Sequence, residues 1–99
     1  MVTLKHDIYD AADYLDTEED IVAYLESALE EGDPALVSQA LGAIARARGI
    51  AEIARDTGLS RSALRQVFSP EGKSDFASVL KVVNALGIRL HAETARVAH

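Results

Sequence analysis

The side chains with the most specific chemistry lie between positions 60 and 66, where serine, arginine and glutamine follow one another closely. Arg65 can make two parallel hydrogen bonds to guanine O6 and N7, and Gln66 can do the same with adenine N6 and N7. Hydroxyl groups suit phosphate oxygens, and a helix N-terminus favours an anion. The residues predicted to contact DNA are Ser60, Arg61, Ser62, Arg65 and Gln66.

A second set of distinctive side chains is acidic and lies in the first third of the chain. Up to Pro34 there are eleven acidic residues against Lys5, a net charge of -10, whereas nine basic and five acidic residues follow. Complementary charge speeds association and selects partners, so this asymmetry predicts a basic protein partner. For any single residue, a solvated helix face is the alternative interpretation. The residues predicted to bind the partner are Asp7, Asp10, Asp13, Asp16, Glu18, Glu19 and Asp20.

Other kinds of site are not indicated by the sequence. There is no cysteine, the three histidines lack ligand spacing, and the order of acids in a calcium loop is absent, so we expect no metal and no cofactor. No nucleophile, base and orienting residue occur together, and we expect no enzyme. The beginning lacks the apolar run of a signal peptide and no stretch approaches a membrane span, so we expect a cytoplasmic protein without membrane contact.

The DNA-contacting side chains require a helix that begins near residue 61. A short helix over about 51–57, a turn over 58–60 and a second helix over 61–68 match a helix-turn-helix. Gly58 suits the positive φ of the turn, and Ser60 can cap the second helix. That helix buries Leu64, Val67 and Phe68, which leaves the side chains at 62, 65 and 66 outward. The alternative is a helical hairpin with a polar outer face.

Three further helices are predicted around this pair. One is capped by Asp16 or Thr17 and ended by Gly32, one spans 34–48, and one is capped by Ser74 and closed by Gly87. Residues 88–92 alternate like a short strand, which requires a partner strand, and we expect that strand to come from a second subunit. The fold class is therefore mainly all-α. We expect a five-helix domain of the Cro/repressor type with an N-terminal acidic arm and a short C-terminal β-strand.

The predicted organisation has three parts. Residues 1–32 form the acidic arm and its helix, 33–93 the helix-turn-helix domain with the strand, and 94–99 a tail.

Gly42 stands inside a predicted helix, where it costs about 1 kcal/mol relative to alanine, so we expect another residue to pack closely there.

From about Tyr14 to Ala92 the sequence resembles the HigA-like family of addiction-module antidote proteins, bacterial antitoxins with a Cro/repressor-type helix-turn-helix. The resemblance lies in TEEDIVAYL (17–25), EGDP (31–34), LGAIARARG (41–49), SPEG (69–72) and FASVLKVVNALGIRL (76–90). It implies a protein that binds and silences a small basic toxin of the RelE/ParE type and represses their shared operon. The sequence departs from the family at Ala51, where a serine or threonine cap is usual, at 65–68 and at 73–74.

Three functions remain open from the sequence. The first is an autoregulatory antitoxin that acts as a homodimer on a palindromic operator in double-stranded DNA, with half-sites about 34 Å apart. The second is a stand-alone transcriptional regulator without a toxin. The third is a protein-interaction module whose helix-turn-helix no longer reads DNA. A small, basic reading frame next to this one would favour the antitoxin over the stand-alone regulator.

Overall fold

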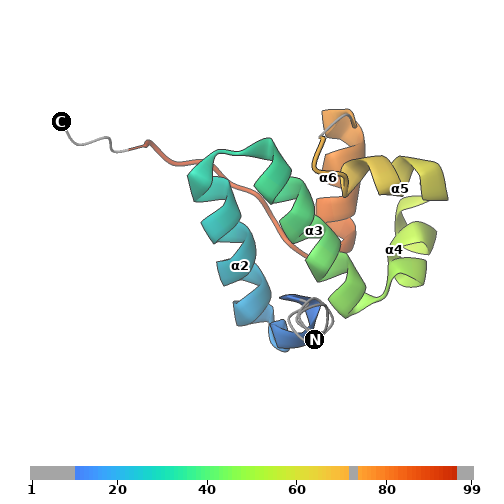
Figure 1. The fold of residues 1–99 in the computed structure, drawn as a ribbon, viewed down its shortest axis with the longest axis horizontal. Helices are drawn as coiled ribbons and strands as arrows, with labels where there is room; N and C mark the ends of the chain where they lie inside the picture. Colours follow the sequence, from blue (N-terminus) through green and yellow to red (C-terminus); the bar gives the residue numbers. More distant parts are fainter. Residues whose placement is uncertain (1–10, 72–73, 96–99) are drawn as a thin grey trace, which may run out of the picture.

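A central helix organises the fold. The computed structural model describes residues 11–71 and 74–95. Its elements are η1 (Ala11–Tyr14), α2 (Glu18–Glu31), α3 (Pro34–Arg48), α4 (Ile50–Thr57), α5 (Arg61–Val67) and α6 (Phe76–Ala85). Helix α3 lies in the middle, with α2 on one side and α4, α5 and α6 on the other (Figure 1). The mainly helical prediction is therefore confirmed, with five α-helices in the described ranges.

The starts of α2 and α3 follow the local signals in the sequence. Thr17 caps α2: its hydroxyl accepts from the Asp20 amide at 3.1 Å, while the Asp20 carboxylate accepts from the Thr17 amide at 3.2 Å. Asp33 caps α3 by accepting from the amide of Ala35 at 3.0 Å, and Pro34 occupies the first helical position. Because Gly32 ends α2 directly before Asp33 begins α3, the two helices form a hairpin, and they pack side by side.

One hydrophobic core joins all five α-helices. Ile21 and Leu25 of α2 belong to the same cluster as Leu41 and Ile44 of α3. The remainder of that cluster runs from Leu15, just after η1, to Leu86, the C-cap of α6, and its most buried large members also include Val67 and Val82. Because α2 shares this core, the acidic helix is fixed to the rest of the protein. The predicted division of the chain into an acidic arm (1–32) and a helix-turn-helix domain (33–93) stays a prediction.

The strand predicted over 88–92 is not found. Residues 88–95 are neither helix nor strand, although Ile88 packs against the core. The physical reason is that a strand exists only within a ladder, and the described chain provides no second strand beside this segment. Alternating residues alone were insufficient to specify it.

Two helix starts also differ from the sequence predictions. Helix α6 is capped by Asp75 and not by Ser74, because the Asp75 carboxylate is the group that accepts from the Ser78 amide, at 3.3 Å. Helix α4 begins at Ile50, one residue before the predicted start, and its N-cap Gly49 has no side-chain hydrogen bond. Helix α4 therefore forms over Ile50–Thr57 although position 51 carries alanine and not the serine or threonine that is usual in the resembling family.

No described helix is long and apolar enough to cross a membrane.

Candidate nucleic-acid interface and acidic helix

Hydrogen bonds made by Thr57 and Gly58 hold the turn between α4 and α5. Gly58 has a φ of 72° in the left-handed region, as predicted, and its amide donates to Ala54 O at 3.0 Å. The Thr57 hydroxyl donates to Ile53 O at 2.8 Å and accepts from the Leu59 amide at 3.2 Å. Leu59 in turn packs against the core. Thr57 therefore ties the end of α4 to the turn that directs α5.

Helix α5 presents its polar side chains to solvent. Leu64 and Val67 are buried, whereas Arg61, Ser62, Arg65 and Gln66 are all exposed, as the predicted helix orientation requires. Ser60 is the N-cap of this helix, and its hydroxyl oxygen accepts from the Ala63 amide at 3.1 Å. The structure thus brings together on one short helix the side chains that were predicted to contact DNA.

Helices α3 and α6 set the position of this pair. Both α4 and α5 pack on α3 and on α6, so the orientation of α5 depends on the core and not on α4 alone. Three more arginines lie before α5: Arg46 and Arg48 in the last turn of α3, and Arg55 in α4. Arg55 approaches Glu52 at 4.0 Å, but both side chains are largely exposed, so this ion pair contributes little.

The exposed acidic residues lie at η1, beside the end of α3, and in α2, which is on the side of α3 away from α5 (Figure 1). Asp13, Asp16, Glu18, Glu19 and Asp20 are exposed, at η1 and the beginning of α2 (Figure 1). Asp20 already has a local role in the α2 cap, and acids in the first turn are favoured by the helix dipole. Asp7 and Asp10 lie outside the described residues. The acidic helix α2 is therefore separated from α5 by α3.

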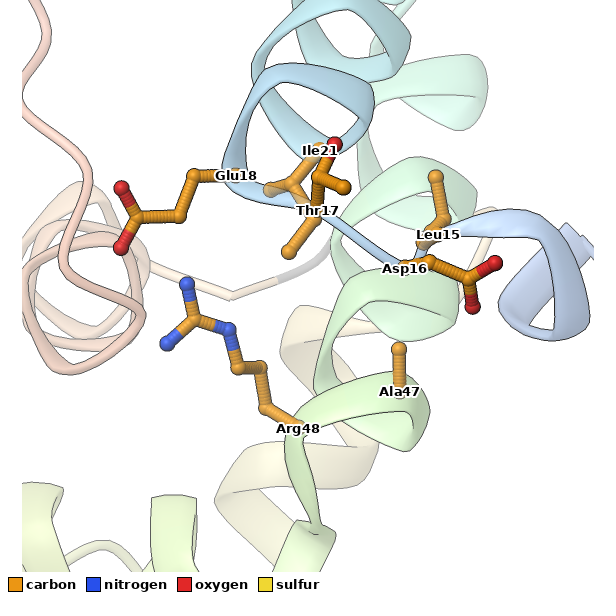
Figure 2. A pocket seen from close by; sticks show the side chains of 7 residues that line it. All are labelled: Leu15, Asp16, Thr17, Glu18, Ile21, Ala47 and Arg48. Carbon is orange, nitrogen blue, oxygen red and sulfur yellow. The ribbon is translucent and has the colours of Figure 1, made fainter.

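A shallow hollow of about 220 Å³ lies where η1 and α2 meet the end of α3. Leu15, Ile21 and Ala47 supply apolar side chains, and the Glu18 carboxylate and Arg48 guanidinium point toward the same opening (Figure 2). Asp16 and Thr17 complete the lining. The hollow carries both signs of charge.

In residues 11–71 and 74–95, no cluster of three His, Asp or Glu side chains is suited to a metal ion.

Sequence reasoning missed two features of these surfaces. The role of Thr57 has a signal in the sequence, because a threonine one residue before a turn glycine can bond to both helix and turn. Val22 and Leu29 were the second omission: both are apolar and yet 50% and 45% exposed. Leu29 lies four residues after Leu25 and eight after Ile21, a helical spacing that by itself predicts a buried side chain.

The protein is small and helical, and it carries a basic helix and an acidic helix on opposite sides of α3. A family model described as probable addiction module antidote protein matches residues 5–94. An uncharacterized protein of Haemophilus influenzae (strain ATCC 51907 / DSM 11121 / KW20 / Rd) is 42% identical over 90 residues, which are 91% of this chain and 93% of that protein. No solved structure matches the chain. The chain belongs to the family of probable addiction module antidote proteins, and an antidote implies a toxin as partner.

Proposed function

We propose that this protein is the antitoxin of a type II toxin–antitoxin module of the HigA-like kind. It neutralises a RelE/ParE-type toxin by direct binding and represses its own operon through the α4–α5 helix-turn-helix. One observation carries the proposal: in a member of an antidote family, an exposed arginine- and glutamine-bearing helix and an acidic helix occupy opposite sides of α3. Two partners of opposite charge can then be bound without competition for one surface.

The DNA-binding half of the proposal rests on α5. Arg65 and Gln66 are exposed and adjacent, which suits bidentate contacts to guanine and adenine in the major groove. Arg61 and Ser62 lie in the first turn, close to the Ser60 cap, where phosphate contacts position a recognition helix. While the Ser60 oxygen accepts from the Ala63 amide, its hydroxyl hydrogen can donate to a phosphate.

Repression by this surface requires two copies of the chain. A single α5 of Arg61–Val67 covers only a few base pairs, and helix-turn-helix proteins obtain affinity from two half-sites about 34 Å apart. We therefore propose a homodimer on a palindromic operator. Both proposed partners are intracellular, so we place the complex in the bacterial cytoplasm.

The toxin-binding half rests on the acidic side of the protein. Exposed carboxylates at Asp13, Asp16, Glu18 and Glu19 attract a basic toxin and hold it away from α5. Neutralisation by this route needs binding and no chemical step, so the protein is not an enzyme. Replacing these carboxylates by amides is expected to weaken toxin binding and to leave operator binding unchanged. Loss of operator binding with intact toxin binding would contradict this division of roles.

The deciding experiment uses the genes next to this one. The protein is co-expressed with the product of the neighbouring reading frame, the complex is purified, and its binding to the upstream DNA is measured by gel shift. The proposal expects a stable complex with a growth-inhibiting basic protein and a specific shift. A shift without any toxin supports the stand-alone regulator instead, and a complex without a shift supports a protein-interaction module.

A further inference from the structure

One flank of α2 carries aliphatic side chains that the fold leaves uncovered. Val22 and Leu29 are 50% and 45% exposed, whereas Ile21 and Leu25 on the same helix are each 4% exposed. Residues seven apart lie on one face of a helix, so Val22 and Leu29 form a stripe of their own. This stripe lies beside the buried face and is available to another molecule.

Glutamates surround this stripe on the helix surface. Glu18 and Glu26 lie four residues on either side of Val22, and Glu26 also lies three residues before Leu29. Like charges spaced by four residues, such as Glu26 and Glu30, destabilise an isolated helix slightly. Helix α2 contains no lysine or arginine to offset them. The α2 flank is defined here as Glu18, Glu19, Val22, Glu26, Leu29 and Glu30, all of which are exposed.

We infer that the α2 flank is the binding site for the basic toxin. Val22 and Leu29 form the apolar centre of the interface, and the glutamates form its rim. The inference rests on the proposed function. Protein interfaces combine an apolar centre with a polar rim, and a few central side chains carry most of the binding free energy. The flank therefore provides affinity as well as the charge attraction that the first acidic residues supply.

The charge of the flank selects among the possible occupants. A second copy of this chain would bring two rows of glutamates against each other, and DNA would be repelled in the same way. A partner with aliphatic side chains set among lysines or arginines complements both features of the flank. Helix α2 also lies at the edge of the molecule, where a partner reaches it without contact with α5 (Figure 1).

The first test replaces both apolar side chains in the full chain. Val22→Ser with Leu29→Ser is expected to weaken binding of the purified toxin by on the order of tenfold or more, mainly through faster dissociation, with the operator shift unchanged. Both side chains are already half exposed, so the fold is retained, which circular dichroism verifies. Phe76→Ser with Leu80→Ser, which changes exposed apolar residues on α6, is the matched control and is expected to leave toxin affinity unchanged.

The second test separates the rim from the centre. Glu26→Gln with Glu30→Gln is expected to slow association with the toxin at low ionic strength, and added salt is expected to remove the difference. Glu31→Gln with Glu71→Gln is the matched control, since Glu31 lies on another side of α2 and Glu71 follows α5. Unchanged association kinetics for Glu26→Gln with Glu30→Gln would remove the rim from the proposal.

The outcomes distinguish this inference from the function on which it rests. If the unaltered protein binds no toxin, the proposed function fails. If the unaltered protein binds toxin and the Val22→Ser, Leu29→Ser variant binds it equally tightly, the α2 flank is not the toxin-binding site, and the proposed function still holds. A change in the sedimentation of the antitoxin alone, with toxin affinity unaltered, would make the flank an interface between two copies and overturn the inference.

Discussion

Gly42 of α3 lies directly against Phe68 at the carboxyl end of α5: a Cβ atom placed on Gly42 would be 3.3 Å from Phe68 Cβ and 3.6 Å from Phe68 Cγ. This contact explains why a glycine is present inside a helix, where it is less favourable than alanine by about 1 kcal/mol. The missing side chain lets α5 approach α3 closely. Gly42 therefore helps to set the position of the helix that carries the proposed DNA contacts.

The first prediction concerns this close approach. Gly42→Leu is expected to lower the free energy of unfolding by about 1–3 kcal/mol, because the new side chain must displace Phe68 from a packed site. Urea unfolding followed by circular dichroism measures the change. Operator binding is expected to weaken in the same variant, since α5 is displaced with Phe68.

A double substitution tests whether Phe68 is the cause. Gly42→Leu combined with Phe68→Ala is expected to be less destabilising than the sum of the two single changes, because removal of the ring makes room for the leucine. Strict additivity of the two effects would mean that Gly42 is constrained by something other than Phe68.

The sequence predicted those parts of the fold that depend on neighbouring residues. Thr17 was one of the two capping residues predicted for α2, and Asp33 before Pro34 is a signal of the same local kind, because a capping side chain bonds to an amide two or three residues away. The exposed face of α5 was predictable for the same reason, since the helical period fixes which side is buried once Leu64 is placed inside.

The remaining features depend on contacts between distant residues. The glycine at 42 indicated a close approach, but its partner Phe68 is far along the chain and became clear only in the structure. The alternation over 88–92 is local, whereas the ladder that makes a strand is not. The exposure of Leu29 depends on the same kind of contact, because the fold buries Ile21 and Leu25 almost completely and leaves Leu29 45% exposed.

The second prediction concerns the outward face of α5. Arg65→Ala with Gln66→Ala is expected to abolish specific operator binding, since each bidentate contact to a base is worth about 1–3 kcal/mol. The fold is expected to be kept, because both side chains are exposed. Footprinting on the upstream DNA measures the effect. Arg89→Ala with Gln39→Ala removes the same exposed side-chain types elsewhere and serves as the control; equal losses in both variants would contradict the assignment of α5.

The third prediction concerns the threonine that ties α4 to the turn. Thr57→Val keeps the shape of the side chain but removes the bonds to Ile53 O and the Leu59 amide. We expect the free energy of unfolding to fall by about 1–3 kcal/mol, because a partly buried amide loses its acceptor. Thr57→Ser retains the hydroxyl and is expected to preserve most of the stability. If serine and valine are equally destabilising in urea unfolding, the hydroxyl is not the stabilising group.

The fourth prediction concerns the pH dependence of stability at the start of α6. Hydrogen bonds from the Ser78 side chain and amide, with a smaller contribution from Lys81, hold the pKa of the Asp75 carboxyl below its ordinary value. A carboxyl whose pKa is lower in the folded than in the unfolded protein stabilises the fold above the unfolded pKa. This stabilisation is lost as the pH falls through the lowered folded pKa, which places the loss below about pH 4.

Asp75→Asn isolates this effect, because asparagine caps a helix about as well as aspartate but does not titrate in this range. Urea unfolding of both proteins between neutral pH and about pH 2 is the measurement. The other carboxylates are common to both proteins, so they cancel in the comparison. We expect the unaltered protein to lose more stability on acidification than Asp75→Asn does, with the difference developing only below about pH 4. Parallel curves over the whole range would show that the capping bonds to Ser78 do not distinguish the charged carboxylate from its neutral form.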